Sequence, residues 1–380
     1  MDFELSEEQR MAIDEAKKFS EKTLAPAAER LDAAQETNVP ALKQLGDLGY
    51  LGMTVPEEYG GSGLGAVAYA GAMIEFSKVD AGTAVGISVQ NSLVNDAIVM
   101  FGTEEQKKAF LPKLASGEWL GCFSLTEAGA GSDPGALRAQ AVRDGDHFVL
   151  TGTKNFTSNG AFAEVIIAFF QTDKTRGAKG ISAFIVRAGT PGYSVGKHED
   201  KLGIRSSSTT ELVFCECRVP ASALLGQENK GLNVALATLD SGRIGIAAQA
   251  VGIAEAALEE AVKYAKERVQ FGQKLADFQA IQFMLADMAV DVEVAKTMLY
   301  RVAGMEEAHK RHTKESAMIK LFASEMAHRV CHKALQIHGG YGYMKDYKIE
   351  RLYRDQRITE IYEGTSEIQR TVIARALLMD

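Results

Sequence analysis

The sequence predicts a multi-domain α+β protein with an all-α N-terminal domain, a middle antiparallel β domain and a C-terminal four-helix bundle. Helical patterns fill residues 1–118 and return over 229–380. Between them, residues 119–228 carry β-branched and aromatic runs separated by glycine and polar turns. The length of 380 residues exceeds the ~250–300 at which a single core usually stops growing. We therefore expect three domains with these boundaries.

The N-terminal region is predicted to be helical from its capping signals and apolar spacing. Ser6 with Gln9 fits a capping box at the first helix, and Pro26 is expected to stop that helix after about Thr23. The expected helices are about 6–23, 42–48, 65–79, 82–101 and one that is capped by Thr103 and Gln106 and ends or kinks at Pro112. The alanine-rich pair, 65–79 and 82–101, is expected to be largely buried.

The middle region is predicted to be a small antiparallel β domain, either a barrel or a sandwich. The expected strands are 144–152, 164–171, 180–187 and 211–219. No helical period of useful length lies between them. Cys215 and Cys217 share one face of the last predicted strand, so we expect both to pack inside the domain.

The C-terminal region is predicted to be a four-helix bundle. The expected helices are 229–268, 277–310, 313–338 and 366–378. Short loops make neighbouring helices antiparallel, which is typical of a bundle. Ser366 with Gln369 fits a capping box at the start of the last helix. Ile368, Val372 and Ala376 lie four apart on one face of it.

Composition and charge exclude several classes of function. The net charge of −8 argues against a protein that binds nucleic acid by neutralising phosphates. Four cysteines are too few for a disulfide scaffold, so a reducing cytoplasm is the expected compartment. Met1 to Glu4 begin acidic rather than basic, so no secretory leader is expected. No apolar run reaches about 18 residues, so we expect no membrane span.

A carboxylate opens the last glycine turn of the chain. Glu363 stands directly before Gly364, and the helix that follows presents unpaired N–H donors and the positive end of its dipole. Glycine lets a ligand approach the backbone closely. Such a carboxylate is well placed to act on a bound molecule. From spacing alone, the alternative is a solvated acid near a helix start, where acids are common.

Two polar segments could hold a ligand. Residues 124–133 crowd two glycines, three hydroxyls and two acids together, which suits a pyrophosphate or a polar heterocycle. Glycine and serine are also ordinary loop residues, so a plain loop is the alternative. In residues 155–160, the aromatic face of Phe156 stands beside the hydroxyls of Thr157 and Ser158.

Other candidate groups have structural alternatives. Arg268 at the end of a long predicted helix could ligate a phosphate, or it could interact with the helix dipole. Asp240 and Arg243 lie three apart in mid-helix, which more often indicates a salt bridge than a site. His328 and His332 lack the acid of a zinc motif, and no metal site is expected. No G-x-G-x-x-G after a strand, no Walker A motif and no G-x-S-x-G elbow occurs.

Seven motifs follow one another along the chain. They are TEAGAGSD from 126, NFTSNG from 155, LDSGRIGIAAQAVGIA from 239, ERVQFGQKL from 267, FQAIQFMLADM from 278, QIHGGYGY from 336 and IYEGTSEIQR from 361. This set, in this order, resembles the acyl-CoA dehydrogenase family over essentially the whole chain. It is most similar to the short-chain (butyryl-CoA) branch in its bacterial form. The resemblance implies the three-domain fold predicted above and a homotetramer, a dimer of dimers, in which two subunits contribute to each FAD site.

The resemblance also implies roles for particular residues. Glu363 is implied as the base that removes the α-proton of an acyl-CoA thioester, while flavin N5 takes the β-hydrogen as hydride to give the trans-2-enoyl-CoA. FAD contacts are implied for Phe123, Ser124, Leu125, Thr126, Gly129, Gly131, Ser132, Phe156, Thr157, Ser158, Arg268, Phe271, Gln279, Gln336, Ile337, His338, Gly339, Gly340, Thr365, Ser366 and Glu367. Of these, Gln336 to Gly340 are expected from a neighbouring subunit. Acyl-CoA contacts are implied for Ser132, Asp240, Ser241, Gly242, Arg243 and Gly364. A buried base of this kind is expected to have a raised pKa.

Three positions depart from the family pattern. Ala128 stands where many members have proline, which is a tolerable loop change. Phe156 stands where many have tryptophan, which keeps a stacking face but loses an N–H donor. Gly242 occupies the position where the isovaleryl and long-chain branches carry their base. Glu363 is therefore expected to be the base here, which argues against an isovaleryl assignment.

The resemblance implies electron-transferring flavoprotein as the electron acceptor, and a place in fatty acid β-oxidation or branched-chain amino acid degradation. The compartment would be the bacterial cytoplasm, or the mitochondrial matrix for a mature eukaryotic form. An acyl-CoA oxidase or nitroalkane oxidase that uses oxygen is a rival, although the presence of Glu363 and the length of 380 residues favour the dehydrogenase. A non-catalytic acyl-CoA-binding helical assembly is a rival of another class. The length and branching of the acyl chain stay open.

Overall fold

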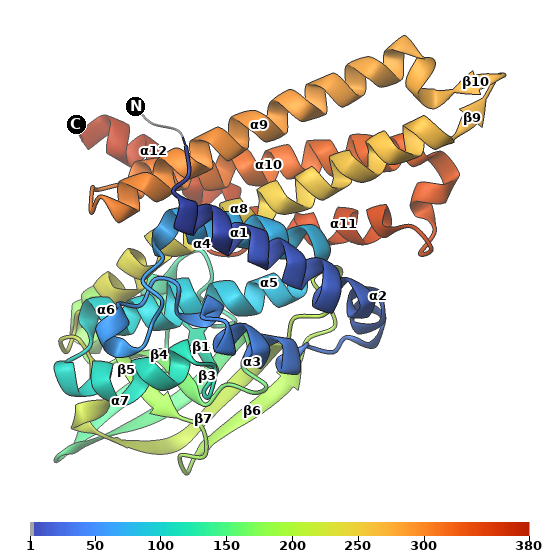
Figure 1. Cartoon of the computed structure of the whole chain (residues 1–380). Helices are drawn as coiled ribbons and strands as arrows, with labels where there is room; N and C mark the ends of the chain where they lie inside the picture. The colour runs from blue at the N-terminus through green and yellow to red at the C-terminus, as the bar shows by residue number, and fades with distance from the viewer. Residues whose placement is uncertain (1–3, 380) are drawn as a thin grey trace.

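The computed structural model describes residues 4–379. The expectation that the chain has no secretory leader rests largely on Met1 to Phe3, and these residues lie outside the described part of the chain. The N-terminal helices lie between the β region at the bottom and the long C-terminal helices at the top (Figure 1). The predicted order of helical, β and helical regions is confirmed.

The N-terminal region is helical as predicted. Its α-helices are α1 Glu7–Phe19, α2 Ala25–Ala34, α3 Val39–Asp47, α4 Gly65–Val79, α5 Ala81–Ser88, α6 Asp96–Phe101 and α7 Glu104–Ala115. The expected stop at Pro26 is wrong, because the chain continues through a π-helical turn, Ser20–Leu24, into α2. Pro26 stands in the first turn of α2, and Leu24 and Ala25 before it keep right-handed helical φ and ψ, so the proline does not interrupt the helical path. Pro112 likewise lies within α7, which ends at Ala115.

The segment predicted as one helix over 82–101 is interrupted by a π-helical stretch, Val89–Asn95. Buried amides fasten this stretch to the loop after α3. Asn91 Nδ2 donates to the carbonyl of Tyr50 at 2.8 Å, and Asn95 Nδ2 donates to that of Leu51 at 2.7 Å. Among the described residues, Ala81–Phe101 is the one helix long and apolar enough to cross a membrane, and 83% of its apolar 18-residue window is buried inside the structure.

The middle region differs from a purely antiparallel domain. Its strands are β1 Gly121–Ser124, β2 Gln140–Asp144, β3 His147–Ser158, β4 Val165–Gln171, β5 Ile181–Arg187, β6 Tyr193–His198, β7 Thr209–Pro220 and β8 Leu224–Leu225. They form one sheet in the order β6-β7-β3-β2-β4-β5-β8, and β1 also pairs with β4. β1 runs parallel to β4, so the sheet is mixed and the expectation of an all-antiparallel domain is wrong. The chain from β1 to β4 returns through β2 and β3 rather than through a direct hairpin, which permits parallel pairing.

The two halves of the sheet fold over a shared aromatic core. Phe170 of β4 meets Phe214 of β7 with ring centroids 5.0 Å apart, and Phe148 of β3 meets Phe184 of β5 at the same separation. Alternate residues of β4 point into this core, while Val165, Ile167 and Phe169 belong to the helical core. Because β4 is covered on both faces, its sequence is continuously apolar.

The two cysteines of β7 do not share a face, contrary to the prediction. Cys217 is buried, whereas Cys215 is exposed. A register shift between β3 and β7 accommodates an extra residue here, and Glu216 has a φ of +52°. A β-bulge breaks the two-residue period of a strand, which places Cys215 outside.

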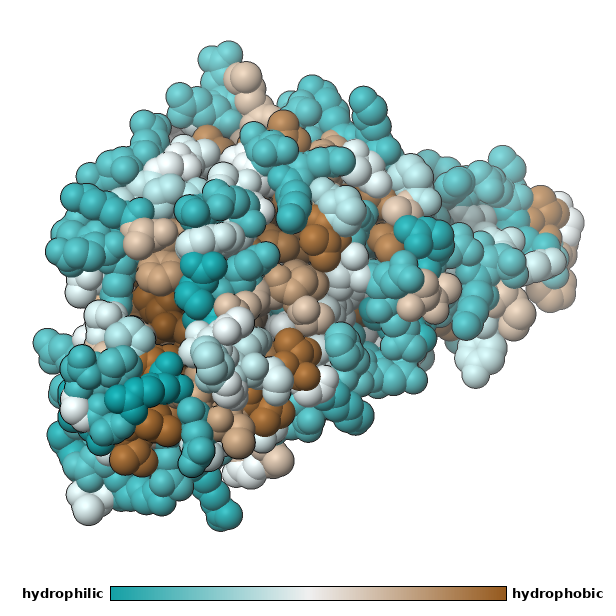
Figure 2. Space-filling model, turned by 90° about the horizontal axis from the view of Figure 1, so that it is seen from below, coloured by the Kyte–Doolittle hydropathy of each residue, from teal (hydrophilic) through white to brown (hydrophobic). Residues whose placement is uncertain are grey.

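The C-terminal bundle is confirmed, with one additional short helix. Its helices are α8 Gly231–Glu267, α9 Gln279–Glu307, α10 Thr313–His338, α11 Lys348–Gln356 and α12 Ser366–Met379. A short hairpin, β9 Val269–Gln270 and β10 Gln273–Lys274, joins α8 to α9 at the tip of a projecting arm (Figure 1). Apolar side chains gather at the tip of this arm (Figure 2). Phe271 there is 95% exposed.

Candidate active site

A cavity of about 580 Å³ opens where the three regions meet. The N-terminal half of α8, the loops at the ends of β1 and β3, and the segment from Tyr362 into α12 form its walls. The predicted site residues that line it are Phe123, Leu125, Thr126, Gly131, Ser132, Phe156, Ser158, Arg243, Glu363 and Gly364. Two loops and a carboxylate that stand far apart in the sequence therefore surround one space.

Glu363 has an uncommon backbone conformation. Its φ is +49°, and that of Gly364 is +93°. A non-glycine residue in the left-handed region costs about 1–3 kcal/mol, so its surroundings must hold it there. Gln369 Nε2 donates to the carbonyl oxygens of Glu363 at 3.2 Å and Gly364 at 2.9 Å. Lys320 Nζ donates to the same Gly364 carbonyl at 2.7 Å.

The start of α12 differs from the predicted capping box. Ser366 is the first residue of the helix, and Thr365 Oγ1 accepts the N–H of Ile368 at 3.4 Å. Gln369 turns its amide back to the turn that carries Glu363 instead of reaching the N-cap backbone. Ser366 Oγ is buried and has no hydrogen-bond partner within residues 4–379. The capping-box prediction is therefore wrong.

The environment of Glu363 is that of a proton acceptor near neutral pH. Burial raises the pKa of its carboxyl to about 7, and the positive charges of Lys320 and Arg243 limit the rise. Its Oε2 atom has no hydrogen-bond partner in the described part of the chain. A base whose pKa lies near the operating pH can both take up and release a proton.

Arg243 pairs with Asp240, which confirms the predicted mid-helix salt bridge. Asp240 also accepts from Thr313 Oγ1 at 2.6 Å, and Ser241 Oγ donates to a carboxylate of α9. Asp240 and Ser241 line a different cavity, of about 940 Å³, between the N-terminal region and the α9–α10 loop. The predicted acyl-CoA set is therefore divided: Ser132, Arg243 and Gly364 line the cavity of Glu363, and Asp240 and Ser241 do not.

A buried ion pair supports the loop after β1. Lys154 Nζ lies 2.7 Å from Glu127 Oε1, and the lysine side chain is fully buried. Glu127 also accepts the backbone N–H groups of Arg138 and Ala139 at 2.6 and 3.0 Å. The carboxylate thus ties the loop to the strand that follows it, which keeps the residues from Leu125 to Ser132 at the cavity.

Some residues of the predicted FAD set lie next to the cavity rather than in its lining. Ser124 and Thr157 are buried and share a hydrogen bond of 2.8 Å beneath the loop. Gly129 is exposed in the loop itself. Thr365, Ser366 and Glu367 form the turn into α12 and its first residues.

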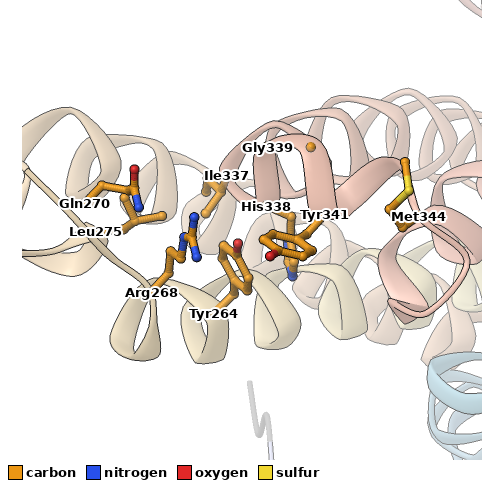
Figure 3. Close-up of a pocket in the computed structure, with 10 residues that line it drawn as sticks. Tyr264, Arg268, Gln270, Leu275, Ile337, His338, Gly339, Tyr341 and Met344 are labelled. Carbon is orange, nitrogen blue, oxygen red and sulfur yellow. The ribbon is translucent and has the colours of Figure 1, made fainter.

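A second cavity, of about 540 Å³, lies at the C-terminal end of α8. Its lining includes Arg268, Ile337, His338, Gly339 and Gly340 from the predicted FAD set. The rings of Tyr264 and His338 stack with centroids 4.4 Å apart beside Arg268 (Figure 3). No described atom lies within 4 Å of a Cβ placed on Gly339 or Gly340, so their backbone is open to a ligand. The remaining members, Phe271, Gln279 and Gln336, are exposed outside the lining.

The two cavities lie far apart along α8. Ile246 lines the first and Tyr264 lines the second. The 18 residues between them (264 − 246) correspond to about 27 Å of helix. The predicted FAD contacts therefore form two separate groups within one chain.

Sequence reasoning missed several residues around Glu363. Tyr362 lines the cavity with α12 residues Ile368, Thr371, Val372 and Arg375. Lys320 is fully buried on α10. The helical period of α10 predicts that position 320 lies on the buried face of the helix. A lysine on a buried face is unusual, and this could have marked Lys320 as a candidate residue.

Three family models match the chain. The acyl-CoA dehydrogenase N-terminal domain matches residues 6–118, the middle domain matches 122–217 and the C-terminal domain matches 229–378.

The chain is also similar to individual proteins. An acryloyl-CoA reductase (NADH) of Anaerotignum propionicum is 48% identical over all of this chain and 96% of its own length. Butyryl-CoA dehydrogenase of Megasphaera elsdenii has 46% identity and a TM-score of 0.98, with both chains fully covered. A chain solved in a study of the electron-transferring flavoprotein of Acidaminococcus fermentans has 48% identity and a TM-score of 0.99, again with full coverage of both.

Proposed function

Because the chain belongs to the acyl-CoA dehydrogenase family of FAD-dependent oxidoreductases, we propose that it converts a short-chain acyl-CoA thioester to the trans-2-enoyl-CoA with Glu363 as the base. The observation that carries the proposal is the carboxylate itself. It lies on the wall of a 580 Å³ cavity with an unpartnered Oε2 among the described residues, and burial raises its pKa to about 7.

The chain's own part of the reaction is proton removal. Glu363 takes the proton from Cα of the acyl group, and the electrons of that C–H bond become the second bond between Cα and Cβ. The FAD, when bound, supplies the acceptor for the hydrogen that leaves Cβ with its electron pair. The cavity wall of Val89, Leu93 and Ile246 is apolar, as an acyl chain requires.

The residues present fit FAD. No described atom lies within 4 Å of a Cβ placed on Gly129 or Gly131, so the loop backbone is open. The aromatic face of Phe156 is 63% exposed at the cavity and could stack on a flavin. Arg268 beside the open backbone of Gly339 and Gly340 offers a cation and N–H donors for a pyrophosphate.

We further propose that two subunits complete each FAD site within a homotetramer. The separation of about 27 Å along α8 between the two groups supports this arrangement. The flavin would lie in the cavity of Glu363, and the second cavity of a neighbouring copy would hold the pyrophosphate and adenosine. The boundaries 1–118, 119–228 and 229–380 are retained as the proposed domains.

Electron-transferring flavoprotein is the proposed acceptor, and the similarity to a chain studied together with such a flavoprotein supports it. The similarity to an acryloyl-CoA reductase (NADH) favours a second candidate: the same site working in reverse, with reduction of a short enoyl-CoA. Both directions need the same proton exchange at Glu363. Measuring turnover of butyryl-CoA with an artificial acceptor and of crotonyl-CoA with a reduced donor separates the two.

The experiment that tests the base is Glu363→Gln. The variant should bind FAD and butyryl-CoA but lose turnover by at least ~100-fold, because proton transfer by a positioned base contributes about 10²–10⁴-fold. Glu75→Gln is a matched control, since Glu75 is a half-buried carboxylate on α4 whose pKa burial also raises. It should keep its activity. Retained turnover in Glu363→Gln would refute the assigned base.

A further inference from the structure

Lys320 is the most deeply buried cation next to the base. It lies on α10 with no exposed surface, and its Nζ donates to the Gly364 carbonyl at 2.7 Å. Its buried neighbours on the helix are Ser316, Ala317, Ile319, Ala323 and Ser324. A lysine among such neighbours is costly because burial removes the ammonium group from water. A methionine would fill nearly the same volume without that cost.

The charges around Lys320 indicate what offsets the cost. Burial lowers the pKa of Lys320 to about 8, and the Glu363 carboxylate is the strongest influence that raises it. Arg243 on α8 acts in the opposite direction, while Glu360 and Glu367 act with Glu363. Lys320 is therefore the cation whose charge acts most strongly on Glu363, and it binds the backbone carbonyl of the next residue, Gly364.

The other groups near Glu363 do not replace Lys320. Arg243 also lowers the pKa of Glu363, but less than Lys320 does, and it shares its charge with Asp240. Tyr69 on α4 is a buried phenol and Tyr362 beside the base is a partly buried one, and burial raises the pKa of both. Neutral phenols cannot balance a carboxylate charge. Gln369 donates to the Gly364 carbonyl that Lys320 also binds, but it carries no charge.

We propose that Lys320 is a positioning residue for the base: its ammonium group fixes the Gly364 carbonyl, which holds Glu363 in its left-handed conformation, and its charge stabilises the ionised carboxylate. The inference rests on the proposed role of Glu363 and assigns the support of that role to one residue of α10. Gln369 also holds the Gly364 carbonyl through a hydrogen bond, but its neutral amide does not stabilise the charge of Glu363. The chain thus offers a neutral and a charged donor on the same carbonyl oxygen, which allows the two effects to be separated.

Three variants of the FAD-loaded protein test the proposal. Lys320→Met removes the donor and the charge, Lys320→Gln keeps a donor but removes the charge, and Gln369→Leu removes a donor but keeps the charge. For each we would measure FAD content, thermal unfolding and the pH profile of kcat/KM with butyryl-CoA. The carboxyl infrared band that disappears in Glu363→Gln gives a second readout, because its pH midpoint reports the ionisation of Glu363 without turnover.

Removing a positive charge close to a carboxylate raises the carboxyl pKa, typically by one unit or more. The infrared midpoint and the acid limb of the profile should therefore move up by about one unit in both Lys320 variants and stay in place in Gln369→Leu. Turnover at pH 7 should fall about tenfold in Lys320→Met, with partial recovery in Lys320→Gln.

The outcomes are distinct. Folded, FAD-loaded Lys320 variants with an unchanged infrared midpoint would overturn the inference while leaving Glu363 as the base. If Lys320→Met does not fold, Lys320→Gln and Gln369→Leu still decide, because equal midpoints in those two would contradict the role of charge. Normal turnover in Glu363→Gln would instead refute the proposed base on which the inference rests.

Discussion

Gly242 leaves the space that the carboxylate of Glu363 occupies. A Cβ placed on Gly242 would overlap Oε2 of Glu363 and lie only 3.1 Å from its Cδ. Position 242 is also where other branches of the family carry their base, according to the resemblance described above. The structure therefore brings position 242 and the carboxylate of Glu363 to the same point, next to Arg243 and two residues after Asp240 on α8.

Gly242→Ala should reduce kcat/KM by about 10–100-fold, because the added methyl group displaces the carboxylate and an error near 1 Å in a reacting group can cost about 10²-fold. Steady-state kinetics with butyryl-CoA measures the loss. Gly304→Ala on α9 is the control, since no described atom lies within 4 Å of a Cβ placed there. It should leave kinetics unchanged and stabilise the protein by about 0.5–1 kcal/mol. Equal kinetics in both variants would show that the close approach at 242 is unimportant.

Activity should depend on pH through Glu363. The base must be ionised to accept a proton, and burial raises its pKa to about 7. The logarithm of kcat/KM should therefore rise with unit slope below about pH 7 and level off above it. A pH profile with a substrate that does not titrate in this range measures the midpoint. An acid limb near pH 4.5, the ordinary value for a glutamate, would contradict the effect of burial on this carboxylate.

Lys154→Met should destabilise the protein by about 3–5 kcal/mol, because it leaves the Glu127 carboxylate buried without its cation. The two side chains are 0% and 10% exposed. Denaturant unfolding measures the change, and FAD content should also fall because Glu127 supports the loop from Leu125 to Ser132. Lys18→Met is the matched control: its pair with Glu15 is 71% and 52% exposed, and its loss should cost no more than about 1 kcal/mol.

Phe271→Ser should weaken self-association without unfolding the chain. Phe271 is 95% exposed on the projecting arm, so its removal loses little packing within one chain. If a neighbouring copy covers it, sedimentation should show smaller species and FAD should be lost more easily on dilution. Met11→Ser on α1, where the side chain is 65% exposed, is the control and should change neither. An unchanged oligomer in Phe271→Ser would argue against the arm as an interface.

The local sequence determined the order of elements and the position of the carboxylate. Helical spacing and β-branched runs are set by residues a few positions apart, so α10 and α12 begin where the patterns predicted, although the capping box at Ser366 did not form. The same locality explains why Glu363 before Gly364 could be singled out without a structure. It also explains the failures: the stop expected at Pro26 did not occur, because a π-helical turn before the proline carries the chain on into α2.

Tertiary structure alone decided which residues meet. The parallel pairing of β1 with β4, the bulge that exposes Cys215, and the meeting of Gly242, Lys320 and Glu363 all join residues more than 40 positions apart or depend on a partner strand. No helical or strand period reports such contacts, because they arise from how whole elements pack. The raised pKa of Glu363 belongs to the same class, since burial and nearby charges set it. Local sequence thus placed a carboxylate at a glycine turn, and packing set the burial and the nearby charges that raise its pKa to about 7.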